Sequence, residues 1–127
     1  MRYLIQSISF FVKLLWHFRI ELLLLFLLLP AIVDIFKPGF FPMHDDTQVG
    51  RVVVMGKALR EGQFPVRWVT DLGHGYGYPI YNFYGPLPYY VGGFLAMLGI
   101  SGLTATKIMM GVGMVGAGVA FFAALFP

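Results

Sequence analysis

The chain has 127 residues, of which 58% are hydrophobic and 12% are charged, and its mean hydropathy is +0.76. A soluble domain carries about 25% charged residues, so this composition excludes a soluble enzyme and predicts an all-α integral membrane protein. The chain has no cysteine, which excludes disulfide bonds. Its net charge of +3 comes from basic residues that flank apolar blocks, so we expect membrane lipid as a partner and no nucleic acid.

Residues 1–19 are predicted to form an amphipathic helix that lies in the membrane interface. Polar side chains recur there every three or four residues, which places them on one face of a helix. They are Arg2, Gln6, Ser9, Lys13 and His17. An ordinary cytosolic helix is the alternative, which the wide apolar remainder of the helix disfavours.

Residues 20–36 are predicted to be the first membrane span, at the short end of the length that a bilayer requires. A cleaved signal peptide is the competing interpretation, but the apolar block begins late and no small-residue cleavage site follows it. Arg2, Lys13 and Arg19 precede the block without any acidic residue among them. The positive-inside rule therefore places the N-terminus in the cytoplasm of a multi-pass protein of the cell membrane.

Residues 37–85 then form a long extracytoplasmic loop, and we expect an amphipathic helix within it over residues 47–61. Residues of the N-cap type precede this segment, apolar residues recur at helical spacing, and Gly62 provides a stop. Asp45 and Asp46 stand at its start. Capping of free N–H groups is the simpler role for the two acids, and acting as a base or chelating a divalent cation is the chemical alternative.

The second half of the loop is rich in glycine and tyrosine, which disfavours a helix and predicts an irregular segment at the membrane surface. Anchoring in the headgroup layer is the plain role for its tyrosines, and binding of a sugar or lipid phosphate is the functional one. The side chains that we assign to substrate binding are Tyr78, Tyr81 and Tyr84, with Arg51 and Arg67 for a phosphate. The plain role of these two arginines is that of a solvated or headgroup-facing charge. His44 and His74 are isolated, so we expect no zinc site.

Residues 86–100 are predicted to be a second, short span, and residues 108–126 a third, joined by a cytoplasmic turn over residues 101–107. The third span has a small-residue face that suits close approach of another helix. This face comprises Gly113, Gly116, Ala117, Ala120 and Ala124. The chain stops directly after this span, and we expect it to be the N-terminal fragment of a larger membrane domain.

Three tracts carry a resemblance to known proteins. They read H-D-D-T-Q-V-G-R from His44, A-L-R-E-G-Q-F-P-V-R-W from Ala58, and G-Y-G-Y-P-I-Y-N-F-Y-G-P-L-P-Y-Y from Gly75. Together they resemble the bacterial multipass membrane family labelled 6-pyruvoyl-tetrahydropterin synthase-related. In layout the chain is also similar to the polyprenyl-phosphate-dependent membrane glycosyltransferases of the C-type fold. The pterin label implies no pterin chemistry, because this chain lacks the histidine ligands for the zinc of the soluble synthases.

The resemblance implies that an acid at the start of the first external loop, here Asp45 or Asp46, acts where a sugar is transferred from a polyprenyl-phosphate donor. It also implies that the rest of the helix bundle completes the donor cavity, so the fragment alone would be inactive. The alternative is a non-enzymatic membrane protein, such as part of a transporter or an envelope assembly factor.

Overall fold

The structure, a computed structural model, describes residues 19–43 and 45–125. Within these ranges the regular structure is helical, and strand-like pairing is limited to one isolated antiparallel bridge between Val69 and Tyr78. The all-α expectation is confirmed for this part of the chain. Of the predicted interfacial helix, all but Arg19 lies outside the described residues. The chain divides into two compact units, Asp34–Gly113 and Met1–Val33 with Met114–Pro127.

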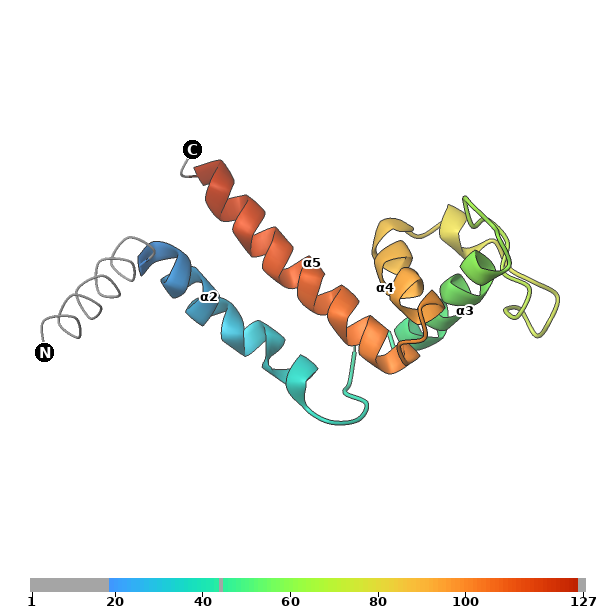
Figure 1. The fold of residues 1–127 in the computed structure, drawn as a ribbon, viewed down its shortest axis with the longest axis horizontal. Coiled ribbons are helices and arrows are strands. Elements are labelled where there is room, and N and C mark those ends of the chain that lie inside the picture. The colour runs from blue at the N-terminus through green and yellow to red at the C-terminus, as the bar shows by residue number, and fades with distance from the viewer. Residues whose placement is uncertain (1–18, 44, 126–127) are drawn as a thin grey trace, which may run out of the picture. The chain divides into compact units, whose positions relative to one another are not determined.

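Helix α5, Gly102–Leu125, is the one described helix that is long and apolar enough to cross a membrane (Figure 1). Its most apolar stretch has a mean hydropathy of 2.1 and leaves large apolar side chains exposed, among them Val119 and Phe121. Helix α2, Arg19–Ile32, continues into the 3-10 helix η1, Val33–Phe36. Together they are apolar but short, as is helix α4, Leu87–Met97, so the predicted spans over 20–36 and 86–100 stay predictions.

Helix α2 approaches α5 closely at Gly118, which is not a residue of the predicted small-residue face. A Cβ atom added at Gly118 would lie 2.8 Å from Cδ1 of Leu28 in α2. Gly113 and Gly116 of the predicted small-residue face have nothing within 4 Å of such an atom, so this face is open and its contact with a further helix stays a prediction. The close approach therefore occurs on a different side of the helix.

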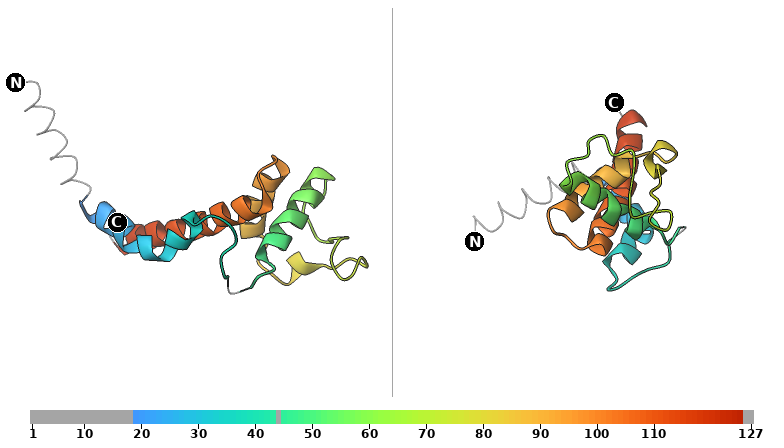
Figure 2. Two further views of the ribbon diagram at one scale, coloured as in Figure 1. Left: turned by 90° about the horizontal axis from the view of Figure 1, so that it is seen from below. Right: turned by 90° about the vertical axis from the view of Figure 1, so that its right-hand side faces the viewer.

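Helices α3, Gln48–Arg60, and α4, Leu87–Met97, pack side by side (Figures 1 and 2). Glycines allow this contact: a Cβ atom at Gly56 would lie 2.9 Å from the backbone oxygen of Gly93, and one at Gly92 would lie 2.9 Å from Val52. Val52 and Met55 are fully buried at the interface. The core extends to the loop and the start of α5 through Ala58, Val66, Val69, Ile80, Tyr81, Tyr89, Ala96, Ala105 and Met109.

Both helices of this pair end in the same glycine-dependent hydrogen-bond pattern. After α3, the N–H groups of Gly62 and Gln63 donate to the carbonyls of Leu59 and Ala58, each at 3.0 Å. Gly62 has a φ of 82°, which glycine adopts without steric cost. The predicted stop at Gly62 is confirmed, and Gly99 ends α4 in the same way with a φ of 98°.

The predicted turn over residues 101–107 is wrong, because residues 102–107 form the first turns of α5. The Ser101 hydroxyl accepts a hydrogen bond from the Thr104 N–H at 3.2 Å, which is the geometry of a helix N-cap. The turn between α4 and α5 is therefore confined to residues 98–101.

The glycine-rich segment between α3 and α4 is irregular, as predicted. Its one helical piece is the 3-10 helix η2, Ile80–Asn82. Gly73, Gly75 and Gly77 all have positive φ angles. Gly77 also lies against the indole of Trp68, which leaves no space for a side chain there. This segment brings the loop tyrosines toward α3.

Candidate functional site

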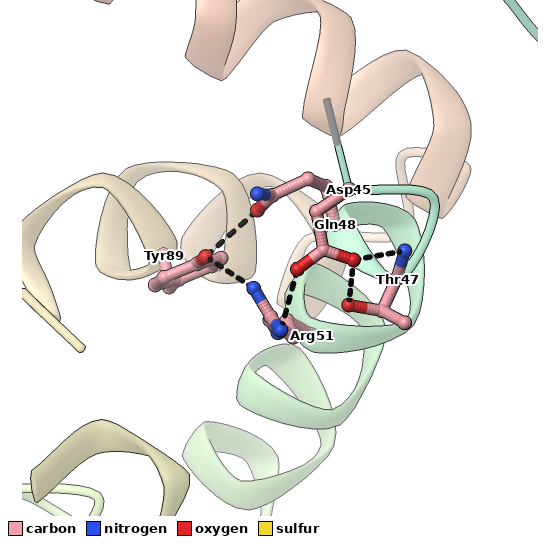
Figure 3. A network of polar contacts seen from close by, with 5 residues as sticks. All are labelled: Asp45, Thr47, Gln48, Arg51 and Tyr89. Atoms are coloured by element: carbon pink, nitrogen blue, oxygen red, sulfur yellow. Dashed lines mark hydrogen bonds and ion pairs between the residues drawn. The ribbon is translucent and has the colours of Figure 1, made fainter. Parts of the chain in front are cut away.

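The candidate site lies at the N-terminus of α3 and is organised by Asp45 (Figure 3). One carboxylate oxygen of Asp45 accepts hydrogen bonds from the N–H of Thr47 at 3.0 Å and from its hydroxyl at 2.6 Å. The other oxygen lies 2.7 Å from Nη2 of Arg51. Asp45 therefore fixes the entry to α3 and neutralises a cation one turn further along.

Arg51 is the most unusual side chain of the site, because it is charged and only 8% exposed. Its Nη1 donates to the Tyr89 hydroxyl at 3.3 Å, and the ring of Tyr84 covers the guanidinium at 4.4 Å. Its Nε is buried without a hydrogen-bond partner in the described structure. A buried donor without a partner is costly, so the position of this guanidinium depends on its ion pair with Asp45 and on the Tyr89 hydrogen bond.

Two tyrosine hydroxyls hold the backbone and side chains around Arg51 in place. Tyr81 donates to the carbonyl oxygen of Arg51 at 2.6 Å, and burial raises the pKa of the Tyr81 hydroxyl, which keeps it a neutral donor. Tyr89 donates to Oε1 of Gln48 at 2.7 Å while it accepts from Arg51. The rings of Tyr81 and Tyr89 also contact each other, with centroids 5.5 Å apart.

A pocket of about 550 Å³ opens beside this network. Asp46 and Arg51 line it from the start of α3, and Tyr78 and Ile80 line it from the loop. Asp46 is exposed, and its carboxylate has no hydrogen bond or ion pair with any described residue. The two adjacent acids therefore differ: Asp45 is engaged by Thr47 and Arg51, whereas Asp46 lines the pocket and has no such partner among the described residues.

The contacts of Asp45 lower its pKa below the usual 3.8, chiefly through the Thr47 hydroxyl, then through the Thr47 N–H and the charge of Arg51. A carboxyl whose pKa is lower in the folded state stabilises the fold above its unfolded pKa and loses this contribution as the pH falls through the folded value. We therefore expect the melting temperature to decrease when the pH is lowered past about 4. Melting curves from pH 2 to 7 should show a smaller acid-dependent fall for Asp45→Asn; identical curves would contradict this role.

The structure brings together most, but not all, of the predicted site residues. Asp45, Arg51, Tyr81 and Tyr84 form one network, and Asp46 and Tyr78 line the adjoining pocket. Arg67 instead lines a second pocket of about 460 Å³, with Tyr81 on its wall.

Sequence reasoning missed Gln48 and Tyr89 in this network. The i, i+3 spacing of Gln48 and Arg51 on a predicted helix was a usable signal, because it places both on one face. Tyr89 gave no such signal, since an interfacial tyrosine and a buried hydrogen-bonding one look alike in sequence.

A divalent cation at the two acids stays a prediction, and the contacts of Asp45 disfavour it. Both oxygens of Asp45 are engaged by Thr47 and by the positive charge of Arg51, which leaves Asp46 as the one free carboxylate of the pair. In the described part of the chain no three histidine or acidic side chains gather as a metal site would require.

Comparison of the chain with protein-family models, with curated proteins and with solved structures finds no match.

Proposed function

We propose that this chain forms part of a membrane glycosyltransferase that transfers a sugar from a polyprenyl-phosphate donor on the extracytoplasmic side of the cell membrane. The observation that carries the proposal is the pocket beside α3, where Asp46 offers a free carboxylate next to the buried cation of Arg51. Such a transfer requires a cation that binds the phosphate of the donor and a base that accepts the proton of the acceptor hydroxyl. The resemblance of the three sequence tracts supports the same class.

In this reaction the acceptor hydroxyl attacks the anomeric carbon of the sugar. A bond forms between the acceptor oxygen and that carbon, and the bond from the carbon to the phosphate oxygen breaks. Asp46 takes the proton of the hydroxyl. The polyprenyl phosphate leaves with the bonding electron pair, and the positive charge of Arg51, which lines the same pocket, stabilises its growing negative charge.

Asp45 acts as a positioning residue in this scheme. Its ion pair with Arg51 at 2.7 Å and its contacts with Thr47 fix the guanidinium relative to Asp46. Because its own pKa is lowered, Asp45 is a poor proton acceptor. Asp45 therefore orients the guanidinium of Arg51, and Asp46 accepts the proton of the acceptor hydroxyl.

The contacts at the start of α5 support two crossings in the described residues, α2 and α5, rather than the expected three. Lys107 donates to the carbonyl oxygen of Lys37, the residue that follows η1, and Gly102 lies against Val53 of α3. The start of α5 is then on the same side as the end of the first span. Helix α4 has eleven residues and is roughly 16 Å long, about half of a hydrocarbon core.

Cysteine labelling tests this topology, and the natural absence of cysteine gives a clean background. Ser101→Cys should react with a membrane-impermeant maleimide in intact cells, because residue 101 is extracytoplasmic when α4 does not cross. A cysteine at Arg2, on the cytoplasmic side, should react after permeabilisation only. Protection of residue 101 in intact cells would mean that α4 crosses and that the topology has three spans.

The alternative is that the chain belongs to a non-enzymatic membrane protein. The structural role of Asp45, which contacts Thr47 and Arg51, favours this alternative. The discriminating test is donor consumption. Membranes that contain the protein, expressed from its complete reading frame, are supplied with a radiolabelled polyprenyl-phosphate sugar, and release of free polyprenyl phosphate is followed. Release above that of membranes without the protein supports the transferase. Release equal to that of membranes without the protein, for every donor sugar tested, contradicts it.

A further inference from the structure

A second surface of the same unit has no part in the chemistry proposed above. It is an apolar groove of about 850 Å³ between α4 and the start of α5. Leu87, Val91 and Phe94 form one wall, and Ile108 and Val112 of α5 form the other. The side chains of Leu87 and Phe94 are 73% and 52% exposed, respectively. An open groove that is lined by apolar side chains suits an apolar ligand.

The groove adjoins a polar pocket, and Tyr90 lines both. In the polar pocket, of about 460 Å³, stand the exposed side chains of Arg67 and Asn82. Arg67 forms no ion pair with any residue that the structure describes. The hydroxyl of Tyr90 accepts a hydrogen bond from the N–H of Val66 at 2.7 Å, which fixes the ring at the junction and leaves its own proton free to donate.

We propose that the groove and the polar pocket together bind one anionic phospholipid of the outer leaflet, with an acyl chain in the groove and the phosphate at Arg67. An uncompensated guanidinium beside the end of an apolar groove matches a molecule that is anionic at one end and apolar at the other. Arg67 and the hydroxyl of Tyr90 are the donors for the phosphate, and the side chains of α4 and α5 cover the hydrocarbon.

The position of α5 favours a bilayer lipid over other occupants. Ile108 and Val112 belong to the one described helix that is long and apolar enough to cross a membrane. One wall of the groove therefore continues into the hydrocarbon core, where phospholipid chains are the abundant apolar species. The inference depends on the membrane placement of α5 and not on sugar transfer, because Arg67 does not line the pocket of Asp46.

Native mass spectrometry of the detergent-purified chain tests the proposal by titration with phosphatidylglycerol and with phosphatidylcholine. We expect tighter binding of phosphatidylglycerol, and we expect Arg67→Gln to weaken it about 10-fold because a charge-assisted contact to the phosphate is lost. Lys57→Gln is the matched control: it removes the same charge where Asp71, 2.7 Å away, already neutralises it. Binding by this variant should match that of the unmodified chain.

Val91→Trp fills the groove and should reduce binding of both lipids, since it displaces the acyl chain rather than the headgroup. Unchanged phosphatidylglycerol binding by Arg67→Gln would overturn the proposal, even if Val91→Trp fails to fold. A second result would also overturn it: the unmodified chain is a dimer, and Val91→Trp is a monomer that binds lipid unchanged. The groove would then hold a second copy of the chain. Displacement of phosphatidylglycerol by inorganic phosphate alone would exclude a role for the acyl chain.

Discussion

Asp46→Asn is expected to lower the rate of sugar transfer by about 10²–10⁴-fold, the usual contribution of a positioned general base. The amide keeps the shape of the side chain but cannot accept the proton of the acceptor hydroxyl. Because the Asp46 carboxylate has no hydrogen bond or ion pair with the described residues, the melting temperature should not change. The measurement is release of polyprenyl phosphate from the radiolabelled donor, with melting curves on the same preparations.

Two further variants separate chemistry from scaffold effects. Glu61→Gln removes an acid at the other end of α3 and should leave both the rate and the melting temperature unchanged. Asp45→Asn should lower the melting temperature, since the buried guanidinium of Arg51 loses its carboxylate partner. If Asp46→Asn transfers sugar at the rate of the unmodified protein, then the assignment of Asp46 as the base is wrong.

Gly56→Leu is expected to destabilise the fold by about 2–3 kcal/mol. Even a Cβ atom at this position would lie 2.9 Å from the Gly93 oxygen and 3.2 Å from the Met97 nitrogen, both of which are backbone atoms of α4. Helices α3 and α4 must therefore separate, which opens the core around Val52 and Met55 and shifts the tyrosines away from Arg51. Thermal unfolding followed by circular dichroism in detergent measures the effect.

Gly50→Leu is the matched control on the same helix. A Cβ atom there has nothing within 4 Å, so the substitution adds helix propensity without a clash. This variant should be as stable as the unmodified chain or slightly more so. Equal loss of stability in both variants would mean that the glycines do not determine the packing of α3 on α4.

Much of the helical framework was predictable from local signals. The N-cap residues and Gly62 located α3 to within one residue at each end, because capping chemistry is encoded in a few neighbouring positions. The start of α5 was missed, since the hydroxyl of Ser101 signals a helix cap and a turn equally well. The contact of Lys107 with Lys37 links residues 70 positions apart, and no local pattern predicts such a contact.

The candidate site was predictable as a list of residues but not as a set of roles. Sequence alone treats Asp45 and Asp46 as equivalent, because each is an acid at a helix start. Their difference arises from the direction of each side chain at the first turn of α3, which turns Asp45 toward Arg51 and leaves Asp46 at the pocket. The burial of Arg51 depends on the glycine-mediated approach of α4, which is a tertiary effect.

Photo-crosslinking tests most directly whether the pocket beside α3 holds the lipid-linked sugar. A polyprenyl-phosphate sugar that carries a diazirine in its first isoprenoid unit is activated by light in membranes that contain the protein, and the modified peptide is identified by mass spectrometry. We expect modification in residues 72–80, with loss of the signal in Arg51→Gln and in the presence of excess unlabelled donor. Modification that is confined to α4 and α5, or that excess donor does not reduce, would contradict it.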